Sequence, residues 1–400
     1  MKTLIELHDE RAIENVIGPE TFRPETVVYL CTHELSSDKV RQEKLREFFA
    51  GRGLKAKIKF IDCSMYKSDK IYSQLHEIAA THEDCAVDVT GGTDAELFAA
   101  GMFCRETGTP AFTYSRKKNR FYNIAGADFA EEMRCSLKYH VADFFLMAGG
   151  KMREGRVDNR ILADYMRFFD PFFELFLRHR RRWPQKITFM QRISRADSDG
   201  RHSLKVEGAY YQKGEHGGKI KADENFLSDF EKLGFIKELT IRHEESVSFT
   251  FRDEWTRSWL RDVGSVLELY MYKICIESSI FDDVVSSAVV DWDGSVGHDS
   301  VSNEIDVVAS RGITPVFISC KACEVGTYAL NELAILRDRF GGKGAKAVIV
   351  TTENCNAATR HRAAQLGIAV IDIEELESGE AAARIKTIMK VNERNSYEQT

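Results

Sequence analysis

The sequence contains little proline and no long run of apolar residues. Only 6 of its 400 residues are proline, and charged residues interrupt every apolar stretch well before the roughly 20 positions that a membrane-spanning helix requires. The opening residues, MKTLIELHDER, lack the apolar core of a signal peptide. From these absences we expect a largely ordered protein that resides in the cytoplasm and has no membrane partner.

Two signature patterns are missing as well. Cys320 and Cys323 form a CxxC without a second pair at zinc-ribbon spacing, and nine scattered cysteines, an odd number, indicate reduced thiols. The glycine-rich element at residues 88–94 is not a GxGxxG, and it follows a later strand instead of the first. This placement disfavours a nicotinamide-dependent oxidoreductase.

The charge balance is mildly acidic, with one strongly basic stretch. A net charge of −6 argues against a protein that coats nucleic acid through bulk electrostatics. Residues 178–186, RHRRRWPQK, nevertheless concentrate positive charge. This stretch is either the solvated end of an amphipathic helix stopped by Pro184 or a contact for phosphates, and both interpretations stay open.

The first segment, residues 1–145, alternates short apolar strands with helical stretches. Strands are predicted at 26–33, 56–62, 85–92 and 110–115, with helices at 38–52, at 68–82 and up to residue 107 between them. Continuous β-branched runs separated by helices of this length are typical of a parallel sheet covered on both faces. We therefore predict a doubly wound, Rossmann-like domain.

The remaining chain divides near residue 255. Residues 146–255 combine a long amphipathic helix, a Gly-rich charged stretch, and a helix followed by two strands joined at RHEES, which is the pattern of a winged helix. Residues 256–400 begin with a helix over 257–278, continue with strands that pair as hairpins, and end with strands alternating with helices. We predict a mixed α/β domain here and an α/β fold class for the whole chain.

The segment NEIDVVASRGITPVFISCK, residues 303–321, places charges within apolar strands. If the turn is centred on the middle of SRGITP, the numbers of facing residues sum to 625, so Asp306 faces Ser319 and Glu304 faces Lys321. These four side chains then form one polar cluster. A shift of the register by one residue would break it.

Carboxylates in such strands destabilise a fold by roughly several kcal/mol unless they are paired or bind a cation. A structural ion pair between Glu304 and Lys321 is one explanation. A further acid, Glu268 in GSVLELYMYK, lies on a predicted helix with a buried face directly before the strands. Because carboxylates near one lysine form the hard oxygen site that suits magnesium or manganese, we expect Glu268, Asp306 and Glu304 to bind a divalent metal.

Two acids and a lysine on adjacent strands, with an acid on the preceding helix, resemble the PD-(D/E)xK nuclease family over about residues 255–375. The resemblance implies that Asp306 binds the metal and that Glu268 is the helix acid. It also implies that Lys321 acts near the attacking water, while the metal and the lysine offset the charge that develops on the phosphorane.

The sequence departs from this family at Ser319, where an acid is expected two positions before the lysine. Either Ser319 contributes a weak oxygen ligand or a water contact, or Glu304 or Glu332 replaces the missing carboxylate. Asp291 and Asp293, at a strand end, either lie near the metal or face solvent. The predicted catalytic residues are Glu268, Asp306, Ser319 and Lys321.

A weaker pattern, DVTGGTD at residues 88–94, lies where a strand of the first segment runs into a helix. Its two glycines let the backbone approach a ligand, and the helix N-terminus offers unpaired N–H groups to an anion. A plain turn capped by Thr93 or Asp94 is the alternative. Residues CTH, at the end of the strand at 26–33, add a second loop on the same carboxyl edge, where doubly wound sheets bind ligands.

This arrangement resembles CARF domains, the dimeric sensors of cyclic oligoadenylates in type III CRISPR defence. The matching residues are Thr32 and His33 in the first-strand loop and Thr90, Gly91, Gly92 and Thr93 in the TGGT element. Members often carry a basic residue after that element, where this chain has Asp94. The expected positive charge is therefore assigned to Arg116 or Lys117.

A CARF domain, a winged-helix-like insert and a PD-(D/E)xK domain, in this order, resemble the CRISPR ancillary nucleases activated by cyclic tetra-adenylate, over nearly the whole chain. The resemblance implies a homodimeric endonuclease that uses Mn²⁺ or Mg²⁺ to cut DNA, single-stranded or duplex, or single-stranded RNA. The alternative function is a ligand-controlled, winged-helix DNA-binding regulator whose third domain is a degenerate nuclease.

Overall fold

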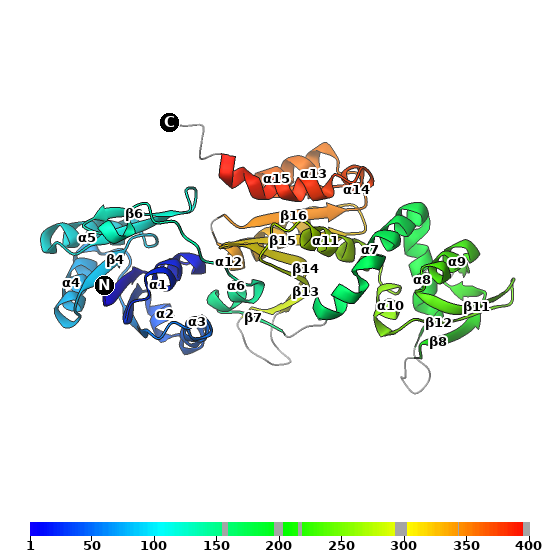
Figure 1. Ribbon diagram of the computed structural model, residues 1–400, viewed down its shortest axis with the longest axis horizontal. Helices are drawn as coiled ribbons and strands as arrows, with labels where there is room; N and C mark the ends of the chain where they lie inside the picture. The colour runs from blue at the N-terminus through cyan, green and yellow to red at the C-terminus, as the bar shows by residue number, and fades with distance from the viewer. Residues whose placement is uncertain (154–158, 196–202, 215–217, 293–301, 343, 395–400) are drawn as a thin grey trace.

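The short apolar strands and the amphipathic helices assemble into three regions arranged in a row (Figure 1). The structure, a computed structural model, describes every residue except 154–158, 196–202, 215–217, 293–301, 343 and 395–400. The order in space differs from the order along the chain, because the sheet built mainly by the last third of the chain lies between the other two regions (Figure 1). Within the described ranges, no helix is both long and apolar enough to cross a membrane.

The first region is a six-stranded sheet in the order β3-β2-β1-β4-β5-β6. The first five strands are parallel, and β6 runs antiparallel to β5. The strands are β1 Thr3–Leu7, β2 Thr26–Cys31, β3 Lys57–Asp62, β4 Cys85–Asp88, β5 Ala111–Ser115 and β6 Arg120–Ala125. Two separate hydrophobic clusters cover its two faces, which confirms the doubly wound sheet.

The helices of this region follow the predicted spacing. They are α1 Ile17–Phe22, α2 His33–Ser37, α3 Lys39–Gly51, α4 Ser68–Thr81 and α5 Asp94–Thr107, with the short turns η1 Ala12–Asn15 and η2 Asp128–Ala130. One strand was missed: β1 precedes the strand predicted as first and lies at the centre of the sheet. Its five residues are all buried, including Glu6, whose charge hides the apolar run in the sequence.

The middle region holds a three-stranded antiparallel sheet in the order β11-β12-β8. Its strands are β8 Lys205–Ala209, β11 Ile236–Arg242 and β12 Ser246–Phe251, with a separate hairpin of β9 Tyr211–Lys213 and β10 Lys219–Lys221. Its helices are α7 Asn159–His179, α8 Trp183–Ile193, α9 Glu224–Lys232 and α10 Glu254–Trp259. The helix α9 followed by the ribbon β11–β12 gives the helix-and-ribbon order expected of a winged helix.

Two helix boundaries differ from the sequence prediction. Pro184 does not stop a helix: it lies at the start of α8, where proline lacks only a donor that is unpaired anyway, and η3 (Arg180–Arg182) separates α8 from α7. The helix predicted over 257–278 is broken between α10 and α11 (Ser265–Glu277). There the Asp262 carboxylate accepts a hydrogen bond from the Ser265 hydroxyl at 2.9 Å, at the start of α11.

The third region is a six-stranded mixed sheet in the order β17-β16-β15-β14-β13-β7. Antiparallel pairs join β7, β13, β14 and β15, whereas β16 and β17 run parallel to β15. Its strands are β7 Lys151–Met152, β13 Asp283–Asp291, β14 Ser302–Arg311, β15 Thr314–Lys321, β16 Lys346–Thr351 and β17 Ile368–Ile371. The edge strand β7 comes from early in the chain, so this sheet is not built from its last third alone.

Helices pack on both faces of the third sheet. One face is covered by α11, α7 and α15 (Ala381–Arg394), whose apolar side chains join one hydrophobic cluster with Val307 and Ile318. The other face is covered by α6 (Val141–Met147), α12 (Thr327–Gly341) and α13 (Ala357–Gln365). A short helix, α14 (Ile373–Glu377), follows β17.

The hairpin β14–β15 has the predicted register. Its pairs run from Val307 opposite Ile318 to Arg311 opposite Thr314, and in each pair the residue numbers sum to 625. Gly312, in the turn, has a φ of +57°, which is strained for residues other than glycine. Tyr139, just before α6, donates its N–H to the Gly312 carbonyl at 2.9 Å and accepts the Ser310 hydroxyl at 2.7 Å.

Candidate functional site

Asp306 lies where β14 and β15 separate. The ladder between these strands stops at the pair Val307–Ile318. Beyond it, the Asp306 Oδ2 accepts the Cys320 N–H at 2.5 Å and the Ser319 hydroxyl at 3.3 Å. The carboxylate therefore satisfies a backbone donor that the ladder no longer pairs, and Ser319 lies beside Asp306, as the register predicts.

Glu268 faces this point from the first turn of α11. Burial, together with the negative charges of Asp306, Asp262 and Glu304, raises the pKa of Glu268 to about 8, while Lys321 acts in the opposite direction. These effects show that the acids and the lysine predicted from sequence share one neighbourhood. They also show that the acids outweigh the single nearby lysine.

The pKa of Asp306 is raised too, chiefly by burial. Its hydrogen bond from Cys320 and the charge of Lys321 act against this rise, and Glu304 adds to it. A bound cation would lower the pKa values of both carboxyl groups, because it favours the charged form of each carboxylate. The electrostatics of the site therefore fit a cation.

Protein ligands for such a cation are few. Among the residues that the structure describes, no three His, Cys, Asp or Glu side chains are grouped so that they could hold a metal ion. Mg²⁺ is usually bound by one or two carboxylates, with waters and substrate phosphates completing its octahedron. Asp306 and Glu268 fit such a sparse site better than an all-protein cage.

Glu304 and Lys321 stand at the rim of the cluster. Glu304 is exposed and faces Val289 on β13, and Lys321 ends β15 opposite Thr351 of β16. No described residue forms an ion pair with the Lys321 ammonium, so the alternative of a structural Glu304–Lys321 pair is not realised. The lysine charge remains available to a ligand.

A strained backbone position lies across from Asp306 on β13. The pairs Ser286–Val307 and Ala288–Ile305 place Ser287 opposite Asp306, and Ser287 has a φ of +52°. Residues other than glycine in this region cost roughly 1–3 kcal/mol and concentrate at functional sites. Nothing in the sequence of β13 signals this position.

Two other candidate acids are engaged elsewhere. Glu332, on α12, accepts the Asn303 side-chain amide at 3.1 Å, on the face of the sheet opposite to α11. Asp291 is buried and bound by the Arg153 guanidinium through both carboxylate oxygens. Asp293 lies outside the described residues. Glu332 therefore does not replace the acid missing at Ser319.

Both predicted sensor loops lie at the carboxyl edge of the first sheet. Thr32 caps α2 by accepting the Leu35 N–H at 3.4 Å, and the His33 Nδ1 lies 2.7 Å from the Asp62 Oδ2 on an exposed surface. The strand β1 lies between β2 and β4, so its own loop, beginning at His8, separates the two predicted loops. That loop was missed with its strand.

The TGGT element packs tightly against the β1 loop. A side chain at Gly91 would place its Cβ 2.7 Å from the Leu7 carbonyl oxygen and 2.9 Å from the Asp9 Cβ, so only glycine fits. Thr93 caps α5 in a capping box with Glu96, and Asp94 is the first helical residue. Gly92, with a φ of +90°, completes the turn.

The Arg116 side chain, directly after β5, is engaged by an acid of the first region. Its Nε lies 3.2 Å from the Glu14 Oε1 of η1, and both side chains are largely buried. The same guanidinium borders Gly342 and Gly344, in the loop between α12 and β16. Arg116 therefore lies where the first region contacts the third sheet, whereas Lys117 is exposed.

His8 is a residue of the sensor edge that the sequence prediction omitted. Burial and the positive charge of Arg41 lower the pKa of His8 to about 3, so it is neutral at physiological pH. Both residues lie near the loop ends of the parallel strands. A neutral imidazole donates a hydrogen bond from one ring nitrogen and accepts one at the other.

Known structures share this architecture along nearly the whole chain. The crystal structure of protein VC1899 from Vibrio cholerae aligns with a TM-score of 0.71 at 17% identity and covers 96% of this chain and 98% of its own. Can2 from Sulfobacillus thermosulfidooxidans, in complex with cyclic tetra-adenylate, aligns with a TM-score of 0.65 at 18% identity and covers 94% and 96%. No family model and no curated protein sequence matches. The shared fold confirms the predicted fold class, a mixed α/β architecture whose sheets contain parallel strands.

Proposed function

We propose that the chain is a CRISPR ancillary nuclease in which a CARF sensor (residues 1–145) controls a PD-(D/E)xK domain (residues 256–400) across a winged-helix-like insert (residues 146–255). The observation that carries the proposal is the Asp306 carboxylate between the separating strands, with Glu268 above it and Lys321 beside it. The fold shared with Can2 supports it.

The chemistry is hydrolysis of a phosphodiester. Asp306 and Glu268 would hold a Mn²⁺ or Mg²⁺ ion, which when bound lowers the pKa of a coordinated water and offsets phosphate charge. Lys321 places its positive charge toward the phosphate oxygens, where negative charge grows as water adds to phosphorus and the P–O bond to the leaving group breaks. The Ser319 hydroxyl orients the Asp306 carboxylate through its 3.3 Å contact.

The activator is cyclic tetra-adenylate, bound at the carboxyl edge of the first sheet. Thr32, His33 and the loop Thr90–Thr93 face this edge, and the backbone N–H groups near the start of α5 suit phosphates. Binding shifts the nuclease toward an active arrangement only if the activator prefers that arrangement.

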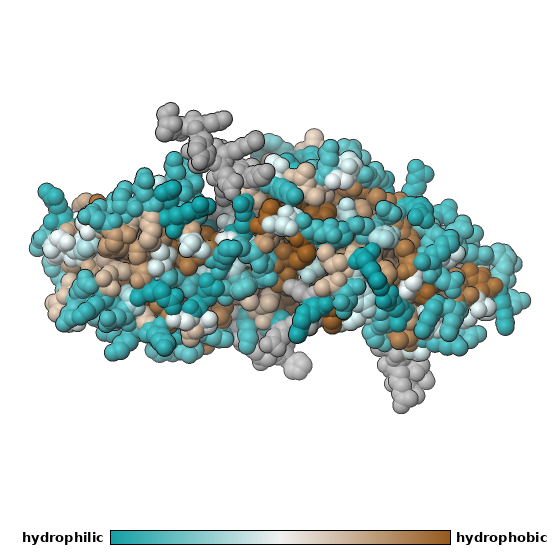
Figure 2. Space-filling model, in the orientation of Figure 1, coloured by the Kyte–Doolittle hydropathy of each residue, from teal (hydrophilic) through white to brown (hydrophobic). Residues whose placement is uncertain are grey.

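A homodimer fits the surface of the sensor. Hydrophilic residues predominate over the face shown in Figure 2. On α5, however, Leu97, Phe98 and Met102 are 37%, 63% and 47% exposed. Large apolar side chains grouped on one helix mark an interaction surface. A second copy of the chain would cover them and bring two sensor edges together.

One assay tests the proposal directly. Cleavage of plasmid, single-stranded DNA and single-stranded RNA would be measured with Mn²⁺, with and without cyclic tetra-adenylate. We expect cleavage only with both, and a loss of roughly 100-fold or more in Asp306→Asn and in Lys321→Ala. Cleavage that survives both substitutions would contradict the site.

A second function, a ligand-controlled DNA-binding regulator, is favoured by two observations. No group of three metal-binding side chains is present among the described residues, and Ser319 stands where the nuclease family has an acid. This function predicts sequence-selective duplex binding with a strong salt dependence and no metal-dependent cutting. Filter binding at several salt concentrations distinguishes the two.

A further inference from the structure

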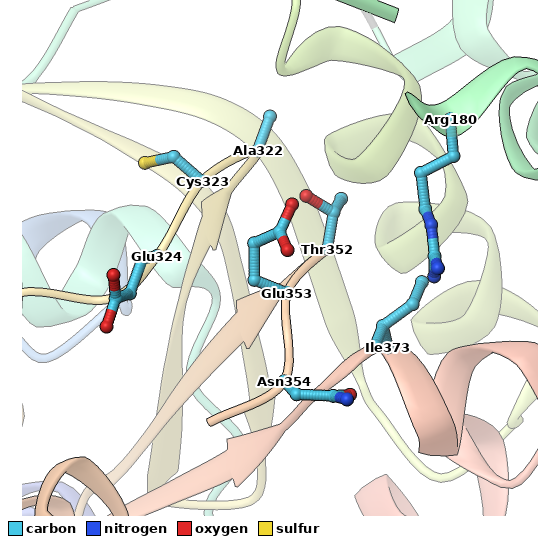
Figure 3. A pocket seen from close by; sticks show the side chains of 8 residues that line it. All are labelled: Arg180, Ala322, Cys323, Glu324, Thr352, Glu353, Asn354 and Ile373. Carbon is cyan, nitrogen blue, oxygen red and sulfur yellow. The ribbon is translucent and has the colours of Figure 1, made fainter. Parts of the chain in front are cut away.

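A pocket opens beside the end of β15, directly after Lys321 (Figure 3). It encloses about 530 Å³, within the roughly 300–1,000 Å³ typical of ligand pockets. The short helix η3, two loops and the start of α14 contribute its lining, which consists of Arg180 in η3, Ala322, Cys323 and Glu324 after β15, Thr352, Glu353 and Asn354 after β16, and Ile373 of α14. We call it the Arg180 pocket.

The wall of the Arg180 pocket is tied to the backbone of the candidate catalytic lysine. Lys321 and Thr351 are partners on neighbouring strands. The Thr352 N–H donates to the Lys321 carbonyl at 3.1 Å, and the Thr351 hydroxyl donates to the Cys323 carbonyl at 2.7 Å. A molecule in this pocket is therefore held next to Lys321.

The lining offers both donors and acceptors. In Figure 3, Glu353 and Thr352 lie on one side of the opening and Arg180 on the other, while Glu324 points away. Arg180 pairs with Glu377 at 2.7 Å. A guanidinium has five N–H donors, so this pair leaves others for a ligand.

Positive charge continues away from the Arg180 pocket. A second pocket of about 300 Å³ shares Arg180 with it and is also lined by Arg181, Arg182, Lys186 and Glu377. No described residue forms an ion pair with Arg181 or Arg182. Because unpaired guanidinium groups bind phosphates well, the two pockets together suit a polyanionic strand.

We propose that the Arg180 pocket binds one unpaired nucleotide of the substrate strand beside the cleaved phosphodiester, with Arg180 on a phosphate and Glu353 and Asn354 on the base edge. This inference rests on the proposed nuclease function and deepens it. The basic stretch RHRRRWPQK then contacts phosphates, as one of its two sequence interpretations holds.

The lining also predicts which base is preferred. The Watson–Crick edge of a base is free for such contacts only outside a duplex, which points to single-stranded substrate. A carboxylate only accepts hydrogen bonds, so Glu353 favours adenine, cytosine or guanine, whose edges carry an amino group, over thymine or uracil, whose single N3–H lies between two carbonyl oxygens that repel a carboxylate. The Asn354 amide can donate and accept, and it adds a second contact to the same edge.

The experiment maps cleavage sites on a randomised single-stranded pool, DNA and RNA separately, by sequencing the new ends with Mn²⁺ and cyclic tetra-adenylate present. We expect a bias for amino-bearing bases at one fixed position next to the cut. Glu353→Gln should reduce that bias roughly fivefold or more, and Asn354→Ala should weaken it. Glu374→Gln, which removes an exposed acid of α14 outside the lining, should leave it unchanged.

A binding arm uses the Asp306→Asn protein, which does not cut, and fluorescent homopolymer oligonucleotides. Adding Arg180→Ala should weaken binding to all sequences alike, by roughly fivefold. It should also reduce the slope of log K against log salt concentration by about one, because one counterion fewer is released on binding. Glu377→Gln is the matched control, since it breaks the same ion pair but keeps the guanidinium, and binding should persist.

The two arms separate failure of the inference from failure of the proposed function. One outcome is that the unmodified protein cleaves with a base preference that Glu353→Gln and Asn354→Ala leave unchanged. This result would overturn the proposed base contacts and would support the nuclease function. Oligonucleotide binding that depends on Arg180 and Glu353, without any cleavage, would overturn the nuclease and leave the pocket. Binding that is insensitive to both residues would overturn the pocket.

Discussion

Burial and the neighbouring charge of Asp306 on β14 together raise the pKa of Glu268 on α11 to about 8. The proton is thus held more tightly in the folded chain than in the unfolded one, where the Glu268 pKa is near 4.5. The stability that this proton confers is fully present below about pH 4.5 and is lost as the pH rises through about 8.

This relationship predicts a pH-dependent effect of Glu268→Gln. Because glutamine is neutral at every pH, the variant should be more stable than the unmodified protein at pH 9 by roughly 2–4 kcal/mol and nearly equal to it at pH 5. Denaturant unfolding with a chelator at both pH values measures this. An equal effect of Glu268→Gln at pH 5 and pH 9 would show that Glu268 does not titrate in this range.

Metal binding should release a proton from the same site. Mn²⁺ favours the charged carboxylate, so its affinity should rise with pH between about 6 and 8, by up to roughly tenfold per unit. Calorimetry in two buffers with different ionisation enthalpies detects the released proton. Asp306→Asn should abolish the binding; heat of binding that persists in this variant would place the metal elsewhere.

Ser319 allows the missing acid to be restored. Ser319→Glu should tighten Mn²⁺ binding by roughly tenfold, because it adds a third carboxylate. Without metal it should lower stability by roughly 1–3 kcal/mol, since a new negative charge would lie beside Asp306. Ser319→Ala, which removes only the hydroxyl, should cost about 1 kcal/mol in both conditions. A destabilisation by Ser319→Glu that Mn²⁺ does not relieve would contradict the ligand role.

Gly91 tests the sensor edge. An alanine Cβ there would overlap the Leu7 carbonyl and the Asp9 side chain, so Gly91→Ala should destabilise the protein by roughly 1–3 kcal/mol and weaken binding of cyclic tetra-adenylate. Gly51→Ala is the matched control, because nothing lies within 4 Å of its added Cβ. Thermal unfolding and effector titration measure both effects. Unchanged effector affinity in Gly91→Ala would remove the TGGT turn from the binding site.

The exposed side chains of α5 test the dimer. Phe98→Glu places a charge among Leu97 and Met102 and should convert the dimer to a monomer at micromolar concentration. Tyr66→Glu, at another exposed aromatic of the same region, serves as the control. Light scattering after size exclusion gives the mass. A mass that Phe98→Glu leaves at the dimer value would move the interface away from α5.

The hairpin could be predicted because its register follows from local rules. Alternation along β14 and β15 and a glycine in the turn fix which residues face one another, and this brings Asp306 to Ser319. The parallel sheet was recognisable for the same reason, since its apolar runs are continuous. Glu268 was indicated by its place on a helix with a buried face directly before the strands, and the resemblance to a nuclease motif then gave it a role.

Other features depend on contacts that a single sequence does not display. The strand β1 was missed because Glu6 interrupts its apolar run, yet in the fold Glu6 is buried beside Asp88 of β4. Arg116 is neutralised by Glu14, which is distant in sequence. The left-handed backbone of Ser287 is imposed by its neighbours on the sheet, and no residue type announces it.

Tyr139 connects the first region to the hairpin β14–β15 through two backbone contacts. Its carbonyl accepts the Ser310 hydroxyl at the end of β14 and its N–H donates to the Gly312 carbonyl in the turn, and Phe145, six residues on, packs its ring against Phe340 with the centroids 5.1 Å apart. The segment around Tyr139, which follows the first region, is therefore hydrogen-bonded to the hairpin that carries Asp306. A rotation of the first region must therefore either carry this hairpin with it or break both hydrogen bonds.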